Sequence, residues 1–367
     1  MKIFFLSERA GVHEKRFLRK LASTNHQIWF LSAFQSAMDD LPPSIHVVPS
    51  LLTEKGAGAR LMIQSVRRLK AISREISPDV LHAGPVTTCA FWAALACKSP
   101  LLAMSWNYDL LGTDLHLGDI WKNKFALRHA RAAVCDSEHV RHKILDLAPT
   151  LRERIFVFPW GVELDRFHPA TKPFGCRNAR GWQDNTLVLS TRSLHPMYGA
   201  STLIEAGIMA LKEAPNLRFI FAADGPLREW CEKRVSESGV GEAFSFLGEI
   251  SEDRMPGLFV EADLYVSASL TDGTSISLLQ AMACGRPVVV SDVPGNREWV
   301  QQGVNGWLTP AGTPAQWARA LIDFCRLPSS RKTEIQKANL TLTRKRADWD
   351  HNFQTLLAAY DFIESTS

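Results

Sequence analysis

Short apolar runs along the chain alternate with longer segments in which apolar residues recur three or four positions apart. The runs of the first half are apolar throughout and do not alternate with polar residues. That pattern is typical of strands buried on both faces of a parallel sheet. The strands it predicts are Ile3–Leu6, Ile28–Leu31, Ile45–Val48, Val80–His82, Leu101–Met104 and Ala132–Cys135.

Helical patterns lie between these runs. The clearest places Met62, Val66, Leu69, Ile72 and Ile76 on one face of an amphipathic helix. Strands that alternate with helices in this way favour a doubly wound α/β domain.

The second half of the chain repeats the design. Helices are expected to begin after Tyr198, Pro226, Asp253 and Thr274. The predicted strands are Leu187–Ser190, Leu217–Ala222, Phe244–Phe246, Leu264–Val266 and Pro287–Val290. The expected fold class is therefore α/β, with two doubly wound parallel-sheet (Rossmann-like) domains facing a central cleft where ligands bind.

A proline-rich segment separates the two halves. It reads Phe158-Pro-Trp-Gly-Val-Glu-Leu-Asp-Arg-Phe-His-Pro169, and we expect a hinge there. The 367 residues fit two domains at roughly 150 residues per domain. We predict an N-terminal domain over residues 1–165, a C-terminal domain over residues 166–346, and a helix over residues 347–367 that packs back on the N-terminal domain.

Composition excludes several classes of protein. The chain is 46% hydrophobic and 22% charged, which is typical of a globular protein and not of a disordered one. No apolar stretch approaches the ~18 residues of a transmembrane helix, and the first apolar run is too short for a signal peptide. The seven cysteines form no CxxC pair, so we expect free thiols, no zinc and no other metal. A cytoplasmic protein is predicted.

The net charge of +4 is too small to indicate a nucleic-acid partner. The positive excess lies in residues 1–165, which hold 21 Lys and Arg against 16 Asp and Glu. Basic residues accompany the helix predicted over 62–76, and Lys15, Arg16, Arg19 and Lys20 form a second group. They are compatible with peripheral docking on an anionic membrane surface, or with an ordinary helix whose charges face water. The basic residues near the predicted helix are Arg60, Arg67, Arg68, Lys70 and Arg74.

One strand–loop–helix–strand module, over residues 264–292, carries the candidate chemistry. Its loop, Asp272-Gly-Thr-Ser275, stands at a helix N-terminus, where unpaired N–H groups and the helix dipole favour an anion such as phosphate. Asp272 and Gln280 are eight residues apart, so both side chains could point into one crevice. The simpler alternative is that Asp272 or Thr274 caps the helix.

In this module Asp272 is followed, after seven residues, by Gln280 and then by Ala-Met-Ala-Cys-Gly-Arg-Pro-Val-Val. It resembles the hallmark of the retaining, nucleotide-sugar-dependent glycosyltransferases of the GT-B fold, family 4 (glycosyl transferases group 1). Their pattern is an acidic residue, seven residues, a second acidic residue and AMA-x-G-x-P-V-V. The resemblance implies that Asp272 contacts the donor sugar, that Gln280 contacts the ribose, and that loop amides near Ser275 and Ile276 hold a diphosphate.

Other stretches resemble the same family. Thr191 to Gly199 is similar to its Arg…Lys-Gly phosphate clamp, with Arg192 at the arginine and Tyr198 where the lysine often stands. The alternatives for Arg192 are a solvated charge or a stabilising ion pair. The remaining similar stretches are the turn Ala222–Pro226, the hinge, the loop Asp292–Val300, and Phe246–Ile250, which resembles the family segment whose backbone faces the nucleotide base. The donor-binding residues so implied are Gly11, Arg192, Tyr198, Gly225, Gly248, Glu249, Asp272, Gly273, Thr274, Ser275, Ile276 and Gln280.

The N-terminal half offers the acceptor side. Gly11 and His13 follow the first strand, and Ser105-Trp-Asn-Tyr-Asp109 resembles the family's His-Gly-x-Asp stretch, with Trp106 in place of the histidine. The predicted acceptor-side residues are His82, Trp106, Asn107 and Asp109. For His13 and His82 the alternative is a structural hydrogen bond. The residues expected to be catalytic are Asp272, Arg192 and His13.

The implied reaction moves a hexosyl group from a nucleoside diphosphate sugar, of UDP or GDP, to an acceptor hydroxyl with retention and without metal. Arg192 and helix-terminal amides would stabilise the departing diphosphate. The implied acceptor is a glycan or a lipid-linked sugar, in assembly of bacterial surface polysaccharide or lipopolysaccharide at the cytoplasmic face of the inner membrane. Two alternatives stay open: a GT-B binding or scaffold module with little or no turnover, and a sugar-nucleotide epimerase.

Three departures from the family pattern bear on the donor. Tyr198 removes a positive charge, Gln280 replaces the second acid with an amide that hydrogen-bonds without charge, and Asp272 is one methylene shorter than the usual glutamate. We expect them to affect donor affinity more than the fold.

Overall fold

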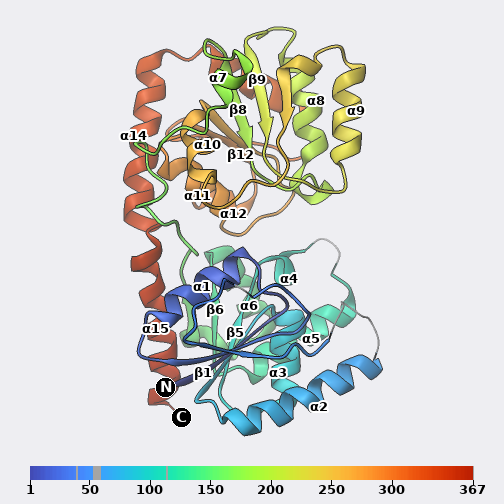
Figure 1. Ribbon diagram of the computed structural model, residues 1–367, viewed down its shortest axis with the longest axis vertical. Coiled ribbons are helices and arrows are strands. Elements are labelled where there is room, and N and C mark those ends of the chain that lie inside the picture. Colours follow the sequence, from blue (N-terminus) through green and yellow to red (C-terminus); the bar gives the residue numbers. More distant parts are fainter. Residues whose placement is uncertain (39, 53–58, 113–114, 367) are drawn as a thin grey trace. The chain divides into compact units, whose positions relative to one another are not determined.

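A computed structural model describes residues 1–38, 40–52, 59–112 and 115–366. The chain divides into two compact units. Unit 1 comprises Met1–Phe158 together with the chain from Phe353 onward, and unit 2 comprises Pro159–Asn352. The last helix, α15 (Trp349–Ser365), begins in unit 2 and continues in unit 1. Figure 1 shows the two units and this helix.

The described part of unit 1 contains a seven-stranded sheet in the order β3-β2-β1-β4-β5-β6-β7. Every neighbouring pair runs parallel. The order reverses between β1 and β4, and this switch point is where open α/β sheets bind ligands. The strands are β1 (Lys2–Ser7), β2 (Gln27–Ser32), β3 (Ile45–Val48), β4 (Val80–Ala83), β5 (Leu101–Met104), β6 (Ala132–Cys135) and β7 (Ile155–Val157).

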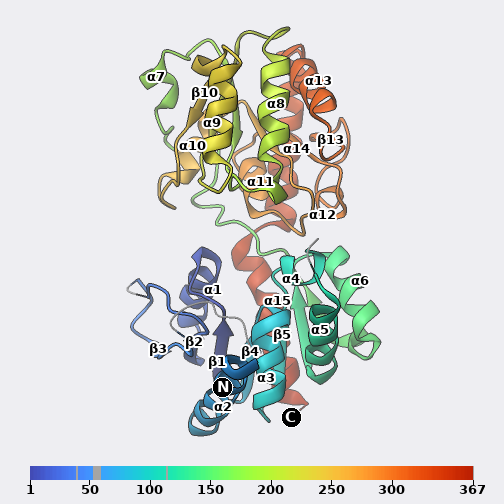
Figure 2. The ribbon, with the colours of Figure 1, turned by 90° about the vertical axis from the view of Figure 1, so that its right-hand side faces the viewer.

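Helices cover both faces of this sheet. Figure 2 looks onto the face covered by α3 and α5; α2 packs beside α3, and α6 beside α5. The other face carries α1 and the C-terminal part of α15, whose Tyr360 ring contacts that of His82 in β4. The helices of unit 1 are α1 (Val12–Ala22), α2 (Ala59–Ile76), α3 (Phe91–Ala96), α4 (Tyr108–Leu111), α5 (Leu117–His129) and α6 (Glu138–Leu147).

Unit 2 has a six-stranded parallel sheet in the order β10-β9-β8-β11-β12-β13. Helix α8 packs against α9 and α13, and α11 packs against α10 and α14. The strands are β8 (Thr186–Ser190), β9 (Leu217–Phe221), β10 (Phe244–Phe246), β11 (Leu264–Ser267), β12 (Val288–Ser291) and β13 (Trp307–Thr309). The helices are α7 (Cys176–Arg180), α8 (Ala200–Ala210), α9 (Arg228–Glu237), α10 (Met255–Glu261), α11 (Ile276–Ala283), α12 (Pro294–Arg297), α13 (Pro314–Cys325) and α14 (Ser329–Arg346).

The proline-rich segment between the halves is tied to the end of α14 inside unit 2. The Val162 amide donates to the Ala347 carbonyl at 2.7 Å, and the Trp349 amide donates to the Val162 carbonyl at 3.1 Å. Gly161 has φ +66°, and a Cβ there would lie 2.9 Å from the Ala347 oxygen. Glycine is therefore required at this crossing, both for its backbone conformation and for the close approach.

The α/β class is confirmed, and every predicted strand is present within a residue at either end. The structure corrects one expectation: β3 is not buried on both faces, because it is an edge strand and exposes His46 and Val47. Sequence reasoning missed two further edge strands, β7 and β13, each of three residues. On α2, the five apolar residues of the predicted face, from Met62 to Ile76, pack against the core, while Ile63 and the basic residues Arg67, Arg68, Lys70 and Arg74 are exposed.

Candidate functional site

Loops at the carboxyl edge of the unit 2 sheet hold the residues predicted to bind the donor. Arg192 and Tyr198 follow β8, Gly225 follows β9, Gly248 and Glu249 follow β10, and Asp272 to Ser275 follow β11. Because all six strands run parallel, these loops share one edge of the sheet. The loops after β8 and β11 are tied together, since the Leu270 amide donates to the Met197 carbonyl at 2.8 Å.

Ser275 is the N-cap of α11. Its Oγ accepts a hydrogen bond from the Leu278 amide at 3.4 Å. The alternative that Asp272 or Thr274 caps the helix is therefore wrong. Thr274 is buried, and its Oγ1 accepts a hydrogen bond from the Trp299 indole at 3.5 Å. The amides of Ile276 and Ser277 stand in the first turn, where an α-helix has no internal acceptor to offer them.

Three groups hold the guanidinium of Arg192. Its Nη1 donates to Ser275 Oγ at 3.1 Å, and its Nη2 lies 3.1 Å from Oδ2 of Asp272. The ring of Tyr198 stacks on the guanidinium, 4.2 Å from ring centroid to carbon. The side chains of Arg192 and Asp272 are 16% and 10% exposed, so the pair is mostly shielded from water. Of the alternatives left open for Arg192, the solvated charge is wrong and an ion pair is present.

Burial affects the pKa values of both Arg192 and Asp272. Burial opposes the charge of Arg192, but Asp272, Tyr265 and Tyr198 outweigh it and raise the pKa of the guanidinium. Burial also raises the pKa of Asp272, against the opposing effect of the Arg192 charge. Within the described residues, Arg192 Nε is buried and has no hydrogen-bond partner. A buried donor of this kind is costly unless a ligand or water satisfies it.

Two hydroxyls behind this cluster were not predicted from the sequence. Tyr265 is fully buried in β11, and its hydroxyl donates to Ser277 Oγ at 2.8 Å. Ser277 Oγ lies 3.2 Å from Ser275 Oγ, so a chain of hydroxyls supports the group that binds Arg192. The signal in the sequence is a tyrosine in an otherwise apolar strand, because a buried phenol needs a polar partner.

Two glycines permit the loops to approach this closely. Gly199 has φ +67°, and a Cβ there would lie 2.1 Å from the Ala268 oxygen. A Cβ on Gly295 would lie 1.9 Å from the Gly273 oxygen and 2.4 Å from the Asp272 oxygen. Larger residues at either position would push apart the loops that carry Arg192 and Asp272.

The other predicted donor residues lie around the same edge. Gly225 packs against the Leu194 backbone, where a Cβ would meet the Leu194 oxygen at 2.6 Å, and this supports a structural turn. Gly248 is buried and Glu249 is exposed. Gln280 is partly exposed on α11, one turn and a half beyond Ser275. Gly273 is buried and Ile276 partly buried.

In unit 1, Gly11 is the N-cap of α1, and His13 is exposed in the first turn of that helix. The His13 ring lies nearly parallel to that of Trp106, with centroids 6.3 Å apart. Trp106 is partly buried against Gly84, where a Cβ would come within 3.0 Å of the indole nitrogen. Loops after β1, β4 and β5 thus meet at the carboxyl edge of this sheet.

His82 is a core residue, which corrects its expected place on the acceptor side. It is 0% exposed, its Nδ1 lies 2.6 Å from the Tyr360 hydroxyl, and its Nε2 lies 3.1 Å from Met104 Sδ. Burial lowers the pKa of His82 to about 3. The alternative stated for His82, a structural hydrogen bond, is therefore the one found, since the side chain faces α15 and not solvent.

Asp109 is also turned inward, 1% exposed. Its Oδ1 accepts from Ser105 Oγ at 2.9 Å and from the Trp106 amide at 3.0 Å, and its Oδ2 accepts from the Val86 amide at 2.6 Å. Burial raises the pKa of Asp109 to about 6. This carboxyl therefore joins the loops after β4 and β5 and is not available for an acceptor.

Asn107 bridges to a third loop of unit 1. Its φ is +71°, and its Nδ2 donates to Asp136 Oδ2 at 2.6 Å. A positive φ in a residue other than glycine is uncommon and concentrates at functional loops. Of the four predicted acceptor-side residues, Trp106 and Asn107 are the two that are partly exposed.

No three His, Cys, Asp or Glu side chains in residues 1–38, 40–52, 59–112 and 115–366 are grouped as a metal site would need. Over those same ranges, no helix has both the length and the apolar character needed to cross a membrane.

Comparisons with known families identify the class. The family model "Glycosyl transferases group 1" matches residues 185–326, and "Glycosyltransferase Family 4" matches residues 10–166. Together they cover most of the chain, one in each half. The chain belongs to the family 4 (group 1) glycosyltransferases, and its two parallel sheets are those of the GT-B fold.

Individual relatives are more distant. A D-inositol 3-phosphate glycosyltransferase from Geodermatophilus obscurus is 28% identical over 216 residues, 56% of this chain and 47% of that protein. The match thus spans about half the length of this relative, and the same holds for a putative glycosyltransferase, EpsD, from Bacillus subtilis, with 26% identity over 51% of this chain and 52% of that protein. HepE from Anabaena, solved in complex with UDP, is similar in structure with a TM-score of 0.81 at 20% identity, over 98% of this chain and all of that one.

Proposed function

We propose that this protein transfers a hexosyl group from a nucleoside diphosphate sugar to an acceptor hydroxyl, with retention of configuration. The observation that carries the proposal is the arrangement around Arg192, which Ser275, Asp272 and Tyr198 hold at the carboxyl edge of the unit 2 sheet. The Nε of Arg192, which has no partner among the described residues, and the first-turn amides of α11 are donors that a diphosphate would satisfy. UDP is favoured as the nucleotide because HepE was solved with it.

The chemistry follows from where these donors stand. The bond from the anomeric carbon to the diphosphate breaks, and its electron pair stays on the phosphate oxygen. Arg192 and the amides of Ile276 and Ser277 stabilise that negative charge. The acceptor oxygen bonds to the anomeric carbon from the face that the diphosphate leaves, and its proton passes to the departing phosphate oxygen. Asp272 receives a sugar hydroxyl once the diphosphate has taken over part of the Arg192 charge.

Tyr198 gives this site a different charge balance from one with a lysine. Arg192 is already paired with Asp272, so the described donor loops present little net positive charge. The Tyr198 ring supplies a cation–π contact and fixes the guanidinium plane. Tyr198 thus orients the Arg192 guanidinium but does not supply the positive charge that a lysine would add. We expect this exchange to retain activity and to reduce nucleotide affinity. Turnover separates this proposal from a non-catalytic module on the same fold.

The test is a thermal-shift screen of UDP, GDP, ADP and CMP and their sugars, with Arg192→Ala as the matched variant. A ligand at 100 times its dissociation constant stabilises by ~2.7 kcal/mol, which gives a shift of a few degrees. One nucleoside diphosphate should stabilise the wild type and not the variant. No shift with any nucleotide would favour the non-catalytic module.

We further propose that unit 1 docks on an anionic membrane surface, with a lipid-linked glycan as acceptor. Most apolar residues of α2 pack inside unit 1, and its outer side carries basic residues and an exposed large apolar residue, Ile63. The two most exposed large apolar side chains in the described part of unit 1 lie on α5, where Leu117 is 86% and Trp121 59% exposed. Lys124 and Arg128 are exposed on the same helix. An indole beside basic residues suits the boundary between headgroups and acyl chains.

Co-sedimentation with vesicles tests this docking. Wild type should bind phosphatidylglycerol vesicles at low salt and release at high salt, and Trp121→Ala should bind several-fold less. Trp230→Ala is the matched control, because Trp230 is also exposed, at 41%, but stands on α9 in unit 2. Equal binding to neutral vesicles, or equal loss in both variants, would exclude docking through α5.

A further inference from the structure

Unit 2 has a polar cavity at the edge of its sheet opposite to the donor loops. Its volume is about 600 Å³, which lies in the range of small-molecule sites. Thr186, the first residue of β8, and Asp263, directly before β11, are part of its wall. Arg192 lies two residues beyond Ser190, the last residue of β8, so the five residues of that strand separate the cavity from the donor loops by roughly 16 Å at ~3.3 Å per residue. The cavity is therefore not the donor site.

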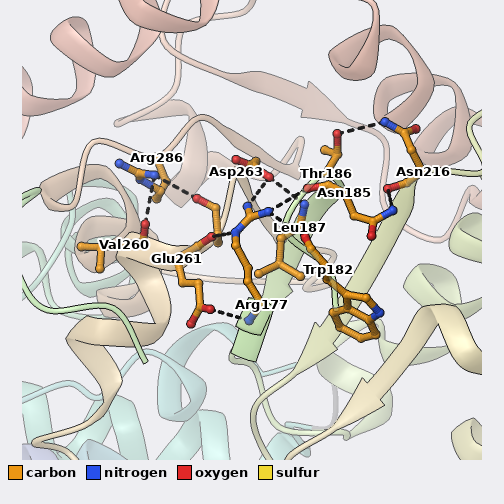
Figure 3. Close-up of polar contacts among 11 residues, drawn as sticks. Arg177, Trp182, Asn185, Thr186, Leu187, Asn216, Val260, Glu261, Asp263 and Arg286 are labelled. Atoms are coloured by element: carbon orange, nitrogen blue, oxygen red, sulfur yellow. Dashed lines mark hydrogen bonds and ion pairs between the residues drawn. The ribbon is translucent and has the colours of Figure 1, made fainter. Parts of the chain in front are cut away.

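Three carboxylates belong to the wall. Those of Glu261 and Asp263 are already engaged, as Figure 3 shows, whereas Asp184 is exposed to solvent. Glu261 accepts hydrogen bonds from the amides of Gly175, Cys176 and Arg177 at 2.8, 3.0 and 2.6 Å. Asp263 accepts from the Arg177 guanidinium at 2.5 Å and from the Leu187 amide at 2.8 Å. These two acids hold α7 and the start of β8 in place, and their charges are compensated.

Two cations of the wall are not paired with a carboxylate in the described residues. Arg286 donates only to backbone carbonyls, those of Cys284, Val260 and Ala262 (Figure 3), and its Nη2 makes no hydrogen bond within the described chain. Lys332, on α14, lies over the Phe324 ring, 4.6 Å from its centroid. Burial lowers the pKa of Arg286; Cys284 and Asp263 oppose this effect, and the neighbouring Arg177 charge adds to it. An anion bound between Arg286 and Lys332 would provide both side chains with the negative charge that they lack.

Neutral polar side chains complete the wall. Asn178, Gln183, Asn185 and Thr186 line the cavity beside the two cations. Amides and hydroxyls of this kind bind hydroxyl groups, whereas the cations bind phosphate. We propose that this cavity binds a small phosphate-bearing molecule, with its phosphate between Arg286 and Lys332 and its hydroxyls on the amide wall. It is a second ligand site, independent of the donor site.

Calorimetric titration of the full chain with inorganic phosphate and with glucose 1-phosphate tests the proposal. Lys332→Glu should weaken binding about tenfold or more. Lys337→Glu is the matched control, because Lys337 is exposed on the same helix but outside the cavity wall, and it should change binding less than twofold. Arg192→Ala should leave this binding unchanged. Tighter binding of glucose 1-phosphate would identify a phosphorylated hydroxy compound as the ligand, and equal binding would identify free phosphate.

Three results would overturn the proposal: no binding of either probe, equal weakening by Lys332→Glu and Lys337→Glu, or loss of binding in Arg192→Ala with none in Lys332→Glu. The last result would place the phosphate at the donor loops. Failure of the nucleotide screen would leave the Lys332 comparison unaffected, so the two proposals fail separately.

Discussion

The carboxyl edges of the two sheets use polar residues in opposite ways. In unit 2, Arg192 and Asp272 come from different loops and face each other, with few other hydrogen bonds. In unit 1, Asp109 accepts three hydrogen bonds from its own loops, and His82 lies in the core with both ring nitrogens engaged. A polar residue directly after a buried strand can therefore serve either of two roles: it can bind a ligand, or it can stabilise the loops around it.

The difference lies in what the neighbouring backbone offers. Asp109 meets the amides of Val86 and Trp106, so its charge is used within the fold. Asp272 meets the Arg192 cation, whose Nε has no hydrogen-bond partner in the part of the chain that the structure describes. A ligand can exchange with an ion pair far more easily than with a set of backbone amides that shape two loops. The comparison predicts large functional effects in unit 2 and large stability effects in unit 1.

The largest effect is expected for Arg192→Ala on transfer. Loss of a preorganised donor to the leaving group typically lowers kcat by ~10²–10³-fold. Arg192→Lys, which keeps the charge and loses the forked geometry, should retain part of the activity. Transfer of a labelled sugar from the donor found in the nucleotide screen measures both. Wild-type rates in Arg192→Ala would place the phosphate site elsewhere.

Asp109→Ala should destabilise unit 1 by about 3 kcal/mol, since it leaves the Val86 and Trp106 amides without an acceptor. Chemical denaturation gives the free energy of unfolding. Nucleotide binding should be retained in the fraction that folds. A variant with native stability and no acceptor use would return Asp109 to the acceptor side, where the sequence first suggested it.

His82→Gln should make the protein less sensitive to mild acid. The pKa of His82 is about 3 in the folded protein against an ordinary 6.5, so the unfolded chain takes up a proton first as the pH falls. Stability from this residue is therefore complete above about pH 6.5 and is lost toward pH 3, by about 2 kcal/mol between pH 6.5 and 5. Unfolding curves at pH 7 and pH 5 should show a smaller difference in His82→Gln than in wild type. Identical pH dependence would contradict a neutral core histidine.

Tyr198→Ala should weaken nucleotide binding about threefold to tenfold, because a cation–π contact contributes roughly 1 kcal/mol. Tyr198→Phe is the matched control, since it keeps the ring and should bind like the wild type. Titration of the identified nucleoside diphosphate measures both. If Tyr198→Phe binds as weakly as Tyr198→Ala, the hydroxyl and not the ring is the important group.

Much of this could be predicted from the sequence, because buried parallel strands are continuous apolar runs. The edge strands β7 and β13 could not, since three residues such as Trp307-Leu-Thr309 carry too little pattern. The donor loops were recognisable because the residues of each loop stand close together in the sequence, with glycines at the positions where the family motif has them. His82 was misplaced because its partner, Tyr360, is 278 residues away in sequence. The hydroxyls of Tyr265 and Ser277 become meaningful only when β11 and α11 are packed together.

Hydrogen exchange with and without the identified nucleoside diphosphate tests the central claim most directly. The account predicts slower exchange in residues 191–199 and 268–280 of unit 2 on nucleotide binding, and little change near Asp109 and His82. Protection confined to the loops after β4 and β5 of unit 1, with none in the two unit 2 segments, would contradict it.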